Sequence, residues 1–354
     1  TMDRINRIVL PENADGALIT SDINRRYFTG MKSSAGMLLI FKECAYLIID
    51  FRYIEKARNT VKNCTVMEQE NLTEQINSLM KKHNAKSLAV ESMDMTLSRM
   101  SFLEKKFPDI EFIKSDELSN NIYDMRTIKS AEEIEKIHKA QEIAEKAFDE
   151  ILGFISPGVT EREIALKLDS CMLENGAEGL SFETIALAGA NTSMPHGVPG
   201  NYKVKNGDFV LMDFGAVYDG YHSDMTRTVC VGQPSEKMGK IYDIVLKAQL
   251  EALKKVKSGI TGSELDGYAR DIIDESGYGD FFGHSLGHGV GMEIHEFPTA
   301  SSKSETILKE NMVVTVEPGI YLPGEFGVRI EDFVVVTENS HQNLTNCPKK
   351  LIIL

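Results

Sequence analysis

Two aspartates stand eleven residues apart around a turn signal in residues 209–232, FVLMDFGAVYDGYHSDMTRTVCVG. Strand-like runs flank Tyr218-Asp219-Gly220, a combination typical of a β-hairpin. If Tyr218-Asp219 form the turn, Asp213 and Asp224 lie directly opposite, and if Asp219-Gly220 form it they lie diagonally. Either register puts them on one face, with Cβ atoms roughly 4.5–8 Å apart. A single strand aspartate is usually solvated, but two among Val, Met and Phe must share a proton or hold a cation.

A second hairpin is predicted in residues 312–336, MVVTVEPGIYLPGEFGVRIEDFVVV. Glu317 and Glu331 are placed symmetrically about Gly324, so the hairpin brings them to one face. Arg329 shares that face with Glu331, and the two could form an ordinary strand salt bridge. Glu317, however, interrupts an apolar run, where a buried carboxylate needs a compensating charge.

A histidine-rich segment lies between them at residues 281–298, FFGHSLGHGVGMEIHEFP. His284 and His288 are four residues apart, which on a helix would form a zinc-binding pair. The four glycines around them disfavour a helix, so we expect an irregular loop or strand whose backbone passes close to a ligand. A lone histidine is usually packed in a core, but three within twelve residues, His295 included, favour a functional site.

Together the three segments offer four carboxylates and at least one imidazole. Such an oxygen-rich set suits Mn²⁺, Co²⁺, Fe²⁺ or Zn²⁺ in a two-metal site better than a structural zinc, which prefers thiolates. Two such ions activate water and polarise a carbonyl or phosphoryl oxygen. The sequence therefore predicts a two-metal hydrolase.

Composition limits the other possibilities. The net charge of −14 argues against nucleic acid as a partner, because phosphate binding needs clustered Lys and Arg. No apolar run approaches the ~18 residues of a membrane span, and the first ten residues lack the pattern of a secretory leader. The five cysteines are scattered without a CxxC pair. We therefore expect a cytoplasmic protein with reduced thiols and no membrane association.

The elements that must position these residues fall into two parts. Residues 1–118 alternate strand and helix signals, as in a small α/β domain, and residues 119–354 form the second domain. Shifting the chain by 101 residues aligns residues 147–176 with 248–277, and both copies contain Gly-x-Thr-x-x-Glu. Thr160 with Glu163, and Thr261 with Glu264, can form capping boxes at equivalent helices. We expect two related halves that pack face to face around a cleft.

The runs D-x-G-A…G-Y…D-x-T-R-T, G-H-S-L-G-H-G-V-G, V-E-P-G-I-Y and R-I-E-D resemble those of the pita-bread metallopeptidases, over nearly the whole chain. Within that family the chain is similar to the Xaa-Pro branch, the prolidases and aminopeptidases P. The resemblance implies an α/β (α+β) fold in which a small creatinase/prolidase-like N-terminal domain precedes a pseudo-twofold catalytic domain with a curved antiparallel sheet and flanking helices.

The resemblance also implies roles. Asp213 would bind one metal, Asp224 and Glu331 both, and His288 with Glu317 the second, while Glu317 also accepts the proton of the attacking water. Contacts to the substrate or to the reaction intermediate are implied for His196, His295 and His284, and Arg329 would orient Glu331. Every ligand position matches the family pattern. The implied metals are two divalent ions per chain, Mn²⁺ first, with Co²⁺, Zn²⁺ or Fe²⁺ as alternatives.

The implied reaction is hydrolysis of peptide bonds before proline in small peptides. A chain this short resembles the small microbial prolidases, so we expect a Xaa-Pro dipeptidase, with aminopeptidase P activity on longer peptides as the alternative. A non-catalytic peptide-binding protein of the same fold is a remoter one. A homodimer is the family expectation.

Overall fold

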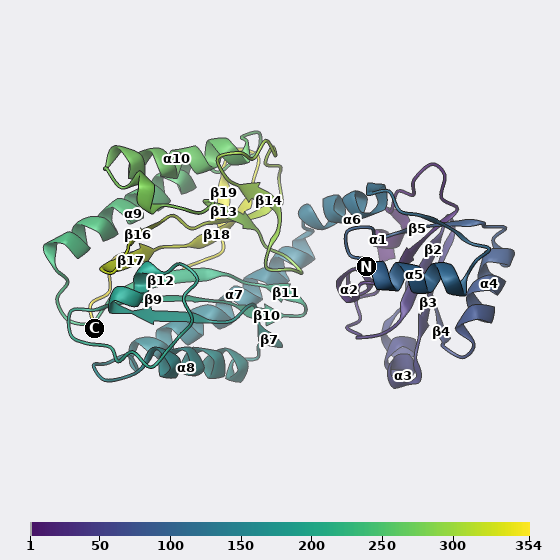
Figure 1. Cartoon of the computed structure of the whole chain (residues 1–354), viewed down its shortest axis with the longest axis horizontal. Coiled ribbons are helices and arrows are strands. Elements are labelled where there is room, and N and C mark those ends of the chain that lie inside the picture. Colours follow the sequence, from purple (N-terminus) through teal and green to yellow (C-terminus); the bar gives the residue numbers. More distant parts are fainter. Residues whose placement is uncertain (1) are drawn as a thin grey trace. The chain divides into compact units, whose positions relative to one another are not determined.

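The computed structural model describes residues 2–354, with side chains from Arg4 onward (Figure 1). The chain divides into two compact units, the first ending at Met125 and the second running from Arg126 to Leu354. The division falls within helix α6 (Glu117–Thr127). No described helix is both long and apolar enough to pass through a membrane.

The first unit is built on a six-stranded sheet in the order β4-β3-β2-β1-β5-β6. Strand β2 runs antiparallel to its neighbours β1 and β3, and the other pairs are parallel. The strands are β1 (Gly16–Ile19), β2 (Met37–Phe41), β3 (Cys44–Ile49), β4 (Thr65–Glu68), β5 (Ser87–Val90) and β6 (Glu111–Ile113). The helices are α1 (Met2–Asn6), α2 (Asp22–Thr29), α3 (Phe51–Thr60), α4 (Leu72–Lys82) and α5 (Leu97–Lys106).

Short polar side chains begin the helices of this unit. Ser21, Asp50, Asn71 and Thr96 each accept a backbone N–H in the first turn of α2, α3, α4 and α5, as helix N-caps do. The fully buried Glu91 follows β5 and accepts the N–H groups of Thr20 and Ser21. Its charge therefore stabilises the positive end of α2.

The second unit contains the predicted repeat of helix pairs. The first pair is α7 (Ala131–Leu152) with α8 (Glu161–Glu174), and the second is α9 (Glu236–Lys255) with α10 (Gly262–Glu275). Both predicted capping boxes are present, with reciprocal bonds in Thr160–Glu163 and Thr261–Glu264. Each capping threonine also forms an isolated antiparallel bridge, to Lys203 and to Ile307 respectively. The two halves therefore share backbone detail as well as helix order.

The two helix pairs lie on opposite sides of the strands in the second unit (Figure 1). Ladders between its strands are antiparallel, in the orders β12-β9-β8, β14-β13-β15-β18-β19, β11-β10-β7 and β16-β17. Each half buries its own core: Phe148, Leu168 and Met212 belong to one, and Val245, Leu265 and Val334 to the other. Each half thus packs its helix pair against strands through its own core.

The first predicted hairpin is present with its diagonal register. Strand β9 (Phe209–Phe214) pairs with β12 (Met225–Cys230), so that Thr226 faces Asp213. Between them β10 (Ala216–Tyr218) pairs with β11 (Tyr221–His222). Asp219 and Gly220 form the turn with φ values of 45° and 82°, as a two-residue hairpin turn of the favoured type requires. Asp213 and Asp224 therefore lie diagonally on one face.

The second hairpin also keeps its predicted register. Strand β15 (Val313–Val316) pairs with β18 (Asp332–Val336), and β16 (Gly319–Leu322) pairs with β17 (Phe326–Arg329). Val316 faces Asp332 in one ladder and Gly319 faces Arg329 in the other. Glu317 and Glu331 thus occupy facing positions between the two ladders.

The remaining elements complete the second unit. They are β7 (Gly179–Leu180), β8 (Ile185–Ala188), β13 (Gly287–Gly289), β14 (Glu296–Ala300), β19 (His341–Asn343) and the short 3₁₀ helices η1 (Gly189–Ser193) and η2 (Gly279–Phe281). His288 lies in β13 and His284 in the turn before it, so the glycine-rich segment is strand and turn rather than helix, as predicted.

Candidate metal centre and substrate cavity

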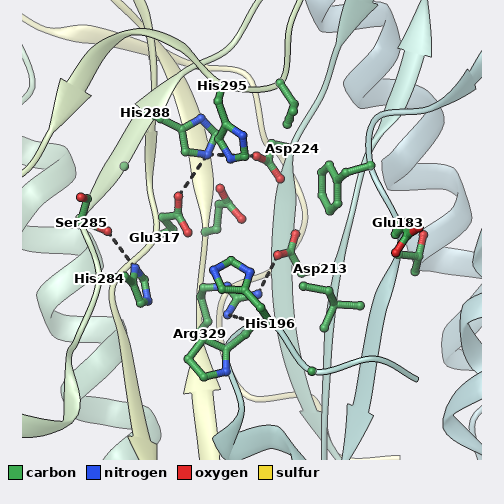
Figure 2. Close-up of a pocket in the computed structure, with 18 of the residues that line it drawn as sticks. Glu183, His196, Asp213, Asp224, His284, Ser285, His288, His295, Glu317 and Arg329 are labelled. Carbon is green, nitrogen blue, oxygen red and sulfur yellow. Dashed lines mark hydrogen bonds and ion pairs between the residues drawn. The ribbon is translucent and has the colours of Figure 1, made fainter. Parts of the chain in front are cut away.

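A cavity of about 550 Å³ opens among the strands of the second unit. Figure 2 shows most of the side chains that line it. All nine residues singled out from the sequence are among them: Asp213, Asp224, Glu317, Glu331, His196, His284, His288, His295 and Arg329. The fold therefore brings together residues that are up to 135 positions apart, as between His196 and Glu331.

Three carboxylates meet at the floor of this cavity. Asp224 is 4% exposed and Glu331 only 1%. Asp213 accepts a hydrogen bond from Arg329 through Oδ2 at 2.6 Å, and Glu331 accepts one from the Thr226 hydroxyl through Oε2 at 2.7 Å. Among the described residues, the other oxygens of Asp213 and Glu331 are buried with no hydrogen-bond partner. Buried carboxylate oxygens without a donor are expensive, so this geometry suits a cation.

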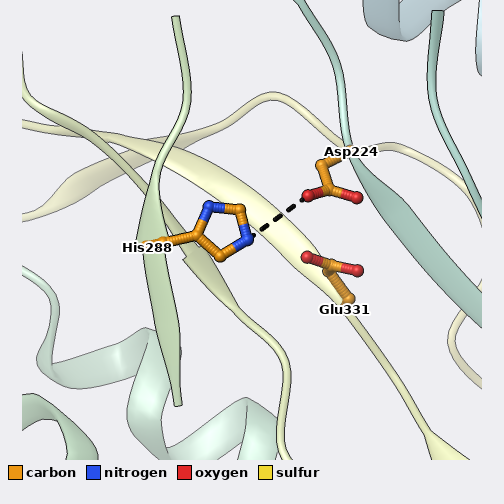
Figure 3. A group of neighbouring side chains, drawn as sticks. All are labelled: Asp224, His288 and Glu331. Atoms are coloured by element: carbon orange, nitrogen blue, oxygen red, sulfur yellow. Dashed lines mark ion pairs between the residues drawn. The ribbon is translucent and has the colours of Figure 1, made fainter. Parts of the chain in front are cut away.

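The His288 imidazole closes the cluster from β13. Its Nε2 lies 3.5 Å from Asp224 Oδ2 and 3.3 Å from Glu317 Oε1. Its Nδ1 lies 3.1 Å from the carbonyl oxygen of Gly289, which favours the tautomer with the proton on Nδ1 and leaves Nε2 available as a metal ligand. Ligand atoms of Asp224, His288 and Glu331 lie within 4.8 Å of one another (Figure 3).

The pKa shifts in the cluster follow from the burial of its carboxylates and from their negative charges. Burial raises the pKa of Asp224 and Glu331 well above the usual range, and neighbouring carboxylates add to the effect. Burial also raises the pKa of Asp213, against the charge of Arg329. For His288, burial opposes protonation, but the contact with Glu317 prevails and raises the pKa to about 9. Protons thus neutralise part of the charge that divalent cations could neutralise instead.

Glu317 behaves differently from the other carboxylates. Burial acts to raise its pKa, but the hydrogen bond and charge of His288 lower it overall. Its Oε1 also accepts the Thr315 hydroxyl at 3.1 Å. Glu317 is therefore held as an anion in a site where Asp224 and Glu331 are driven toward protonation, and the environment gives neighbouring carboxylates different acid–base properties.

The other histidines surround the carboxylates. The His295 ring lies edge-on to that of His288, with centroids 4.3 Å apart. His284 Nε2 lies 2.8 Å from the Tyr321 hydroxyl. His196 is exposed at the cavity rim, and Figure 2 shows it beside Arg329, away from His288 and His295. Imidazoles thus reach the cavity from both sides of the carboxylates.

Arg329 contacts a different carboxylate from the one that the resemblance implied. Its guanidinium bonds directly to Asp213. It reaches Glu331 through Thr226, whose hydroxyl accepts from Arg329 Nε at 3.0 Å and donates to Glu331. The Tyr321 hydroxyl, 2.9 Å from Arg329 Nη1, connects the same guanidinium to His284.

Sequence reasoning assigned no role to Thr226, Thr315 or Tyr321, although each interacts with a site residue. Thr226 and Tyr321 belong to the D-x-T-R-T and V-E-P-G-I-Y runs, which was the only available signal. A hydroxyl side chain inside a strand is too common to indicate function by itself.

Two protein-family models match this chain, one over each part. Residues 135–338 match Metallopeptidase family M24, and residues 2–128 match the Creatinase/Prolidase N-terminal domain. The Xaa-Pro dipeptidase of Pyrococcus horikoshii is 44% identical over 339 residues, which cover 96% of this chain and 94% of that protein.

Two solved structures show the same fold over the whole chain. The Xaa-Pro dipeptidase from Bacillus anthracis has a TM-score of 0.95 at 42% identity, covering 100% of this chain and 99% of that one. An X-Pro aminopeptidase from Thermotoga maritima has a TM-score of 0.94 at 39% identity, covering 99% and 100%. The predicted pita-bread fold is confirmed, and the chain belongs to metallopeptidase family M24.

Proposed function

We propose that this chain is a Xaa-Pro dipeptidase that uses two divalent metal ions. The observation that carries the proposal is the cluster of Asp224, His288 and Glu331 inside a metallopeptidase fold, where one buried oxygen each of Glu331 and the neighbouring Asp213 has no donor among the described residues. Relatives named Xaa-Pro dipeptidase or prolidase match nearly all of the chain, which supports dipeptidase over the alternatives.

The donor set fits the metals that the family implies. Asp213 would hold one ion, His288 and Glu317 the other, and Asp224 with Glu331 would serve both. Four carboxylates to one imidazole favour Mn²⁺, with Co²⁺, Zn²⁺ and Fe²⁺ as alternatives. When bound, such ions supply Lewis-acid activation of water and of the scissile carbonyl.

The chain's own residues supply the proton transfers and orientation. Glu317, held as an anion by His288, would accept a proton from the attacking water and return it to the leaving nitrogen. His295 and His196 would contact the substrate carbonyl and its tetrahedral intermediate from opposite sides. His284 would contact the substrate from the wall of the cavity. Arg329 would keep Asp213 in place directly and Glu331 through Thr226.

Proline in the leaving group would be recognised by shape. A peptide bond before proline has no N–H to donate, so a pocket must pack the ring. The cavity offers Phe182, Ile185, Val198 and Ile294 for such packing.

The cavity offers few charged groups that could bind the free carboxylate of a dipeptide. Among the described residues that line it there is no lysine, and its one arginine, Arg329, is 3% exposed and already bonded to Asp213. The imidazoles of His196, His284 and His295 and the hydroxyls of Thr184, Ser285 and Thr299 are other lining side chains that can donate hydrogen bonds. Substrate length is therefore the property to test first.

The test is an assay of the purified protein with Mn²⁺ or Co²⁺ added. A Xaa-Pro dipeptide, a Xaa-Pro-Yaa tripeptide and a Xaa-Ala dipeptide are compared, each also after chelation. We expect cleavage of the Xaa-Pro dipeptide above the other two and its loss on chelation. Activity restricted to the tripeptide would refute the dipeptidase proposal in favour of aminopeptidase P. Failure to take up any metal would favour a peptide-binding protein instead.

We also propose a cytoplasmic homodimer. All five cysteines are free, which supports a reducing compartment. Sedimentation of the purified chain tests the dimer, and a monomer at micromolar concentration would refute it.

A further inference from the structure

A buried ion cluster contacts the segment that carries His295. We define the Glu296 ion cluster as Arg126, Lys129, Glu293 and Glu296. Arg126 Nη2 donates to Glu296 Oε1 at 2.5 Å and to Glu293 Oε2 at 2.6 Å, and Lys129 Nζ lies 3.1 Å from Glu296 Oε2. The side chains of Arg126, Lys129 and Glu296 are 4%, 1% and 5% exposed, while that of Glu293 is 39% exposed. The charges of the two cations and the two carboxylates therefore sum to zero.

The cluster joins segments that are far apart in sequence. Arg126 belongs to the end of α6, and Lys129 to the connection before α7, where its N–H donates to Asn311 at 2.9 Å. Glu293 lies in the turn between β13 and β14, and Glu296 is the first residue of β14. The end of α6 and the connection before α7 are therefore bonded to the segment that contains Glu293 and Glu296.

The turn itself is shaped around the Glu296 carboxylate. The Glu293 N–H donates to Glu296 Oε1 at 3.1 Å. A Cβ placed on Gly291 would lie 2.3 Å from Glu296 Oε2, so only glycine fits there without displacement. The Gly291 carbonyl in turn accepts the His222 N–H at 2.8 Å. Loss of the carboxylate would remove the side-chain bonds of Glu296 to Arg126 and Lys129. The bond of Glu293 to Arg126 and backbone bonds such as that from the Gly291 N–H to the Glu293 carbonyl would remain.

Glu296 and His295 are adjacent but face different surroundings. Successive side chains of an extended chain point to opposite faces. His295 lines the catalytic cavity beside His288, whereas Glu296 is not among the cavity-lining residues and points into the ion cluster. The cluster therefore acts on the site through the backbone of this turn, which carries His295 and also Ile294, another cavity-lining residue.

We propose that Arg126, Lys129 and Glu296 are positioning residues, whose buried ion cluster fixes the turn of residues 291–296 and thereby places His295 in the cavity beside His288. This rests on the proposed function of His295 as a substrate contact. Buried ion pairs contribute little net stability compared with apolar packing, but losing one member leaves an uncompensated charge. Such a cluster suits the task of specifying one conformation of a turn.

The test is a double-mutant cycle between Glu296→Gln and His295→Ala, measured as kcat/KM on a Xaa-Pro dipeptide. In the wild-type background we expect Glu296→Gln to lower kcat/KM by about 10- to 100-fold, because small displacements of a catalytic group have effects of that size. In the His295→Ala background it should change kcat/KM by no more than about twofold, since the group it positions is gone. Metal content should equal that of wild type.

Glu91→Gln is the matched control. Glu91 is equally well buried, lies in the first unit, and contacts no site residue, so its loss should affect stability but leave kcat/KM unchanged. Equal losses from Glu296→Gln in both backgrounds would overturn the proposal, as would metal loss parallel to activity loss. If Glu296→Gln does not fold, Lys129→Met provides the same cycle, because Arg126 still neutralises Glu296.

Hydrogen exchange gives a measurement that does not depend on activity. In Glu296→Gln, amides of residues 291–296 should exchange at least about tenfold faster, while those of the β9–β12 hairpin remain unchanged. Unchanged exchange in residues 291–296 would overturn the positioning role even if the protein is an active dipeptidase. Faster exchange in a protein with no Xaa-Pro activity would instead refute only the proposed function.

Discussion

Replacing Asp224 by asparagine should separate the stability of the metal-free protein from its capacity to bind metal. Asp224 is 4% exposed, and burial together with the charge of Asp213 raises its pKa well above the usual range. An uncharged amide of the same shape resembles the protonated carboxyl and removes repulsion from Asp213. The contact of its Oδ2 with His288 Nε2, at 3.5 Å, is lost in exchange. We therefore expect the Tm of the metal-free variant to equal or exceed that of the metal-free wild type.

The stabilisation that bound metal gives to the folded protein should instead decrease in Asp224→Asn. A ligand at 100 times its Kd stabilises the folded state by about 2.7 kcal/mol, and at its Kd by only about 0.4 kcal/mol. For domains of about 150–250 residues, 1 kcal/mol corresponds to about 2–4 °C in Tm. If the substitution raises Kd about 100-fold, a metal-induced rise in Tm of about 5–11 °C in the wild type becomes about 1–2 °C in Asp224→Asn.

The assay is thermal unfolding with and without Mn²⁺, alongside metal analysis and Xaa-Pro dipeptide hydrolysis. Asp219→Asn is the matched control, because Asp219 lies at the exposed turn of the same hairpin with a φ of 45°, which asparagine also tolerates. We expect Asp224→Asn to lose at least one metal and most activity, and Asp219→Asn to retain both. A full wild-type metal shift in Asp224→Asn would refute the reasoning.

Three further predictions concern the same site and its support. Thr226→Val removes the hydroxyl between Arg329 and Glu331 and should weaken metal binding by about 10- to 100-fold, as measured by titration with Mn²⁺; unchanged affinity would contradict the linking role. Because the pKa values of Asp224 and Glu331 are raised, the metal-free folded protein binds more protons than the unfolded chain, so these groups make its unfolding free energy fall as pH rises above about 4. The unfolding free energy of the metal-loaded protein should not show this fall with pH. The same dependence of unfolding free energy on pH with and without metal would refute the prediction. Thr160→Ala should lower stability by about 1 kcal/mol through its capping box, with kcat unchanged in the same preparation.

Local patterns in the sequence predicted both hairpins and the register of the second, but left two registers open for the first. The separation of Glu317 and Glu331 about Gly324 predicted facing positions, and both flanking ladders keep that register. The Thr160–Glu163 capping box was predicted in the same way. These features depend on residues near one another in the chain, where turn chemistry and side-chain period determine geometry.

Other features depended on tertiary structure because their partners are distant in sequence. Arg329 bonds to Asp213, 116 positions away, and not directly to Glu331 in its own hairpin. The fold also turned a common strand threonine, Thr226, into the link between Arg329 and Glu331. Glu296 meets Arg126 across 170 positions, and no periodicity could have paired them.

The residue types and spacings by themselves determined that each hairpin would carry two carboxylates on one face, because short hairpins specify which side chains share a face. Tertiary structure decided that a guanidinium bonds directly to Asp213 but not to Glu331, and that each keeps one buried oxygen without a donor among the described residues. That difference depends on burial and on partners brought from distant segments, since the energy of a charge depends on everything packed around it.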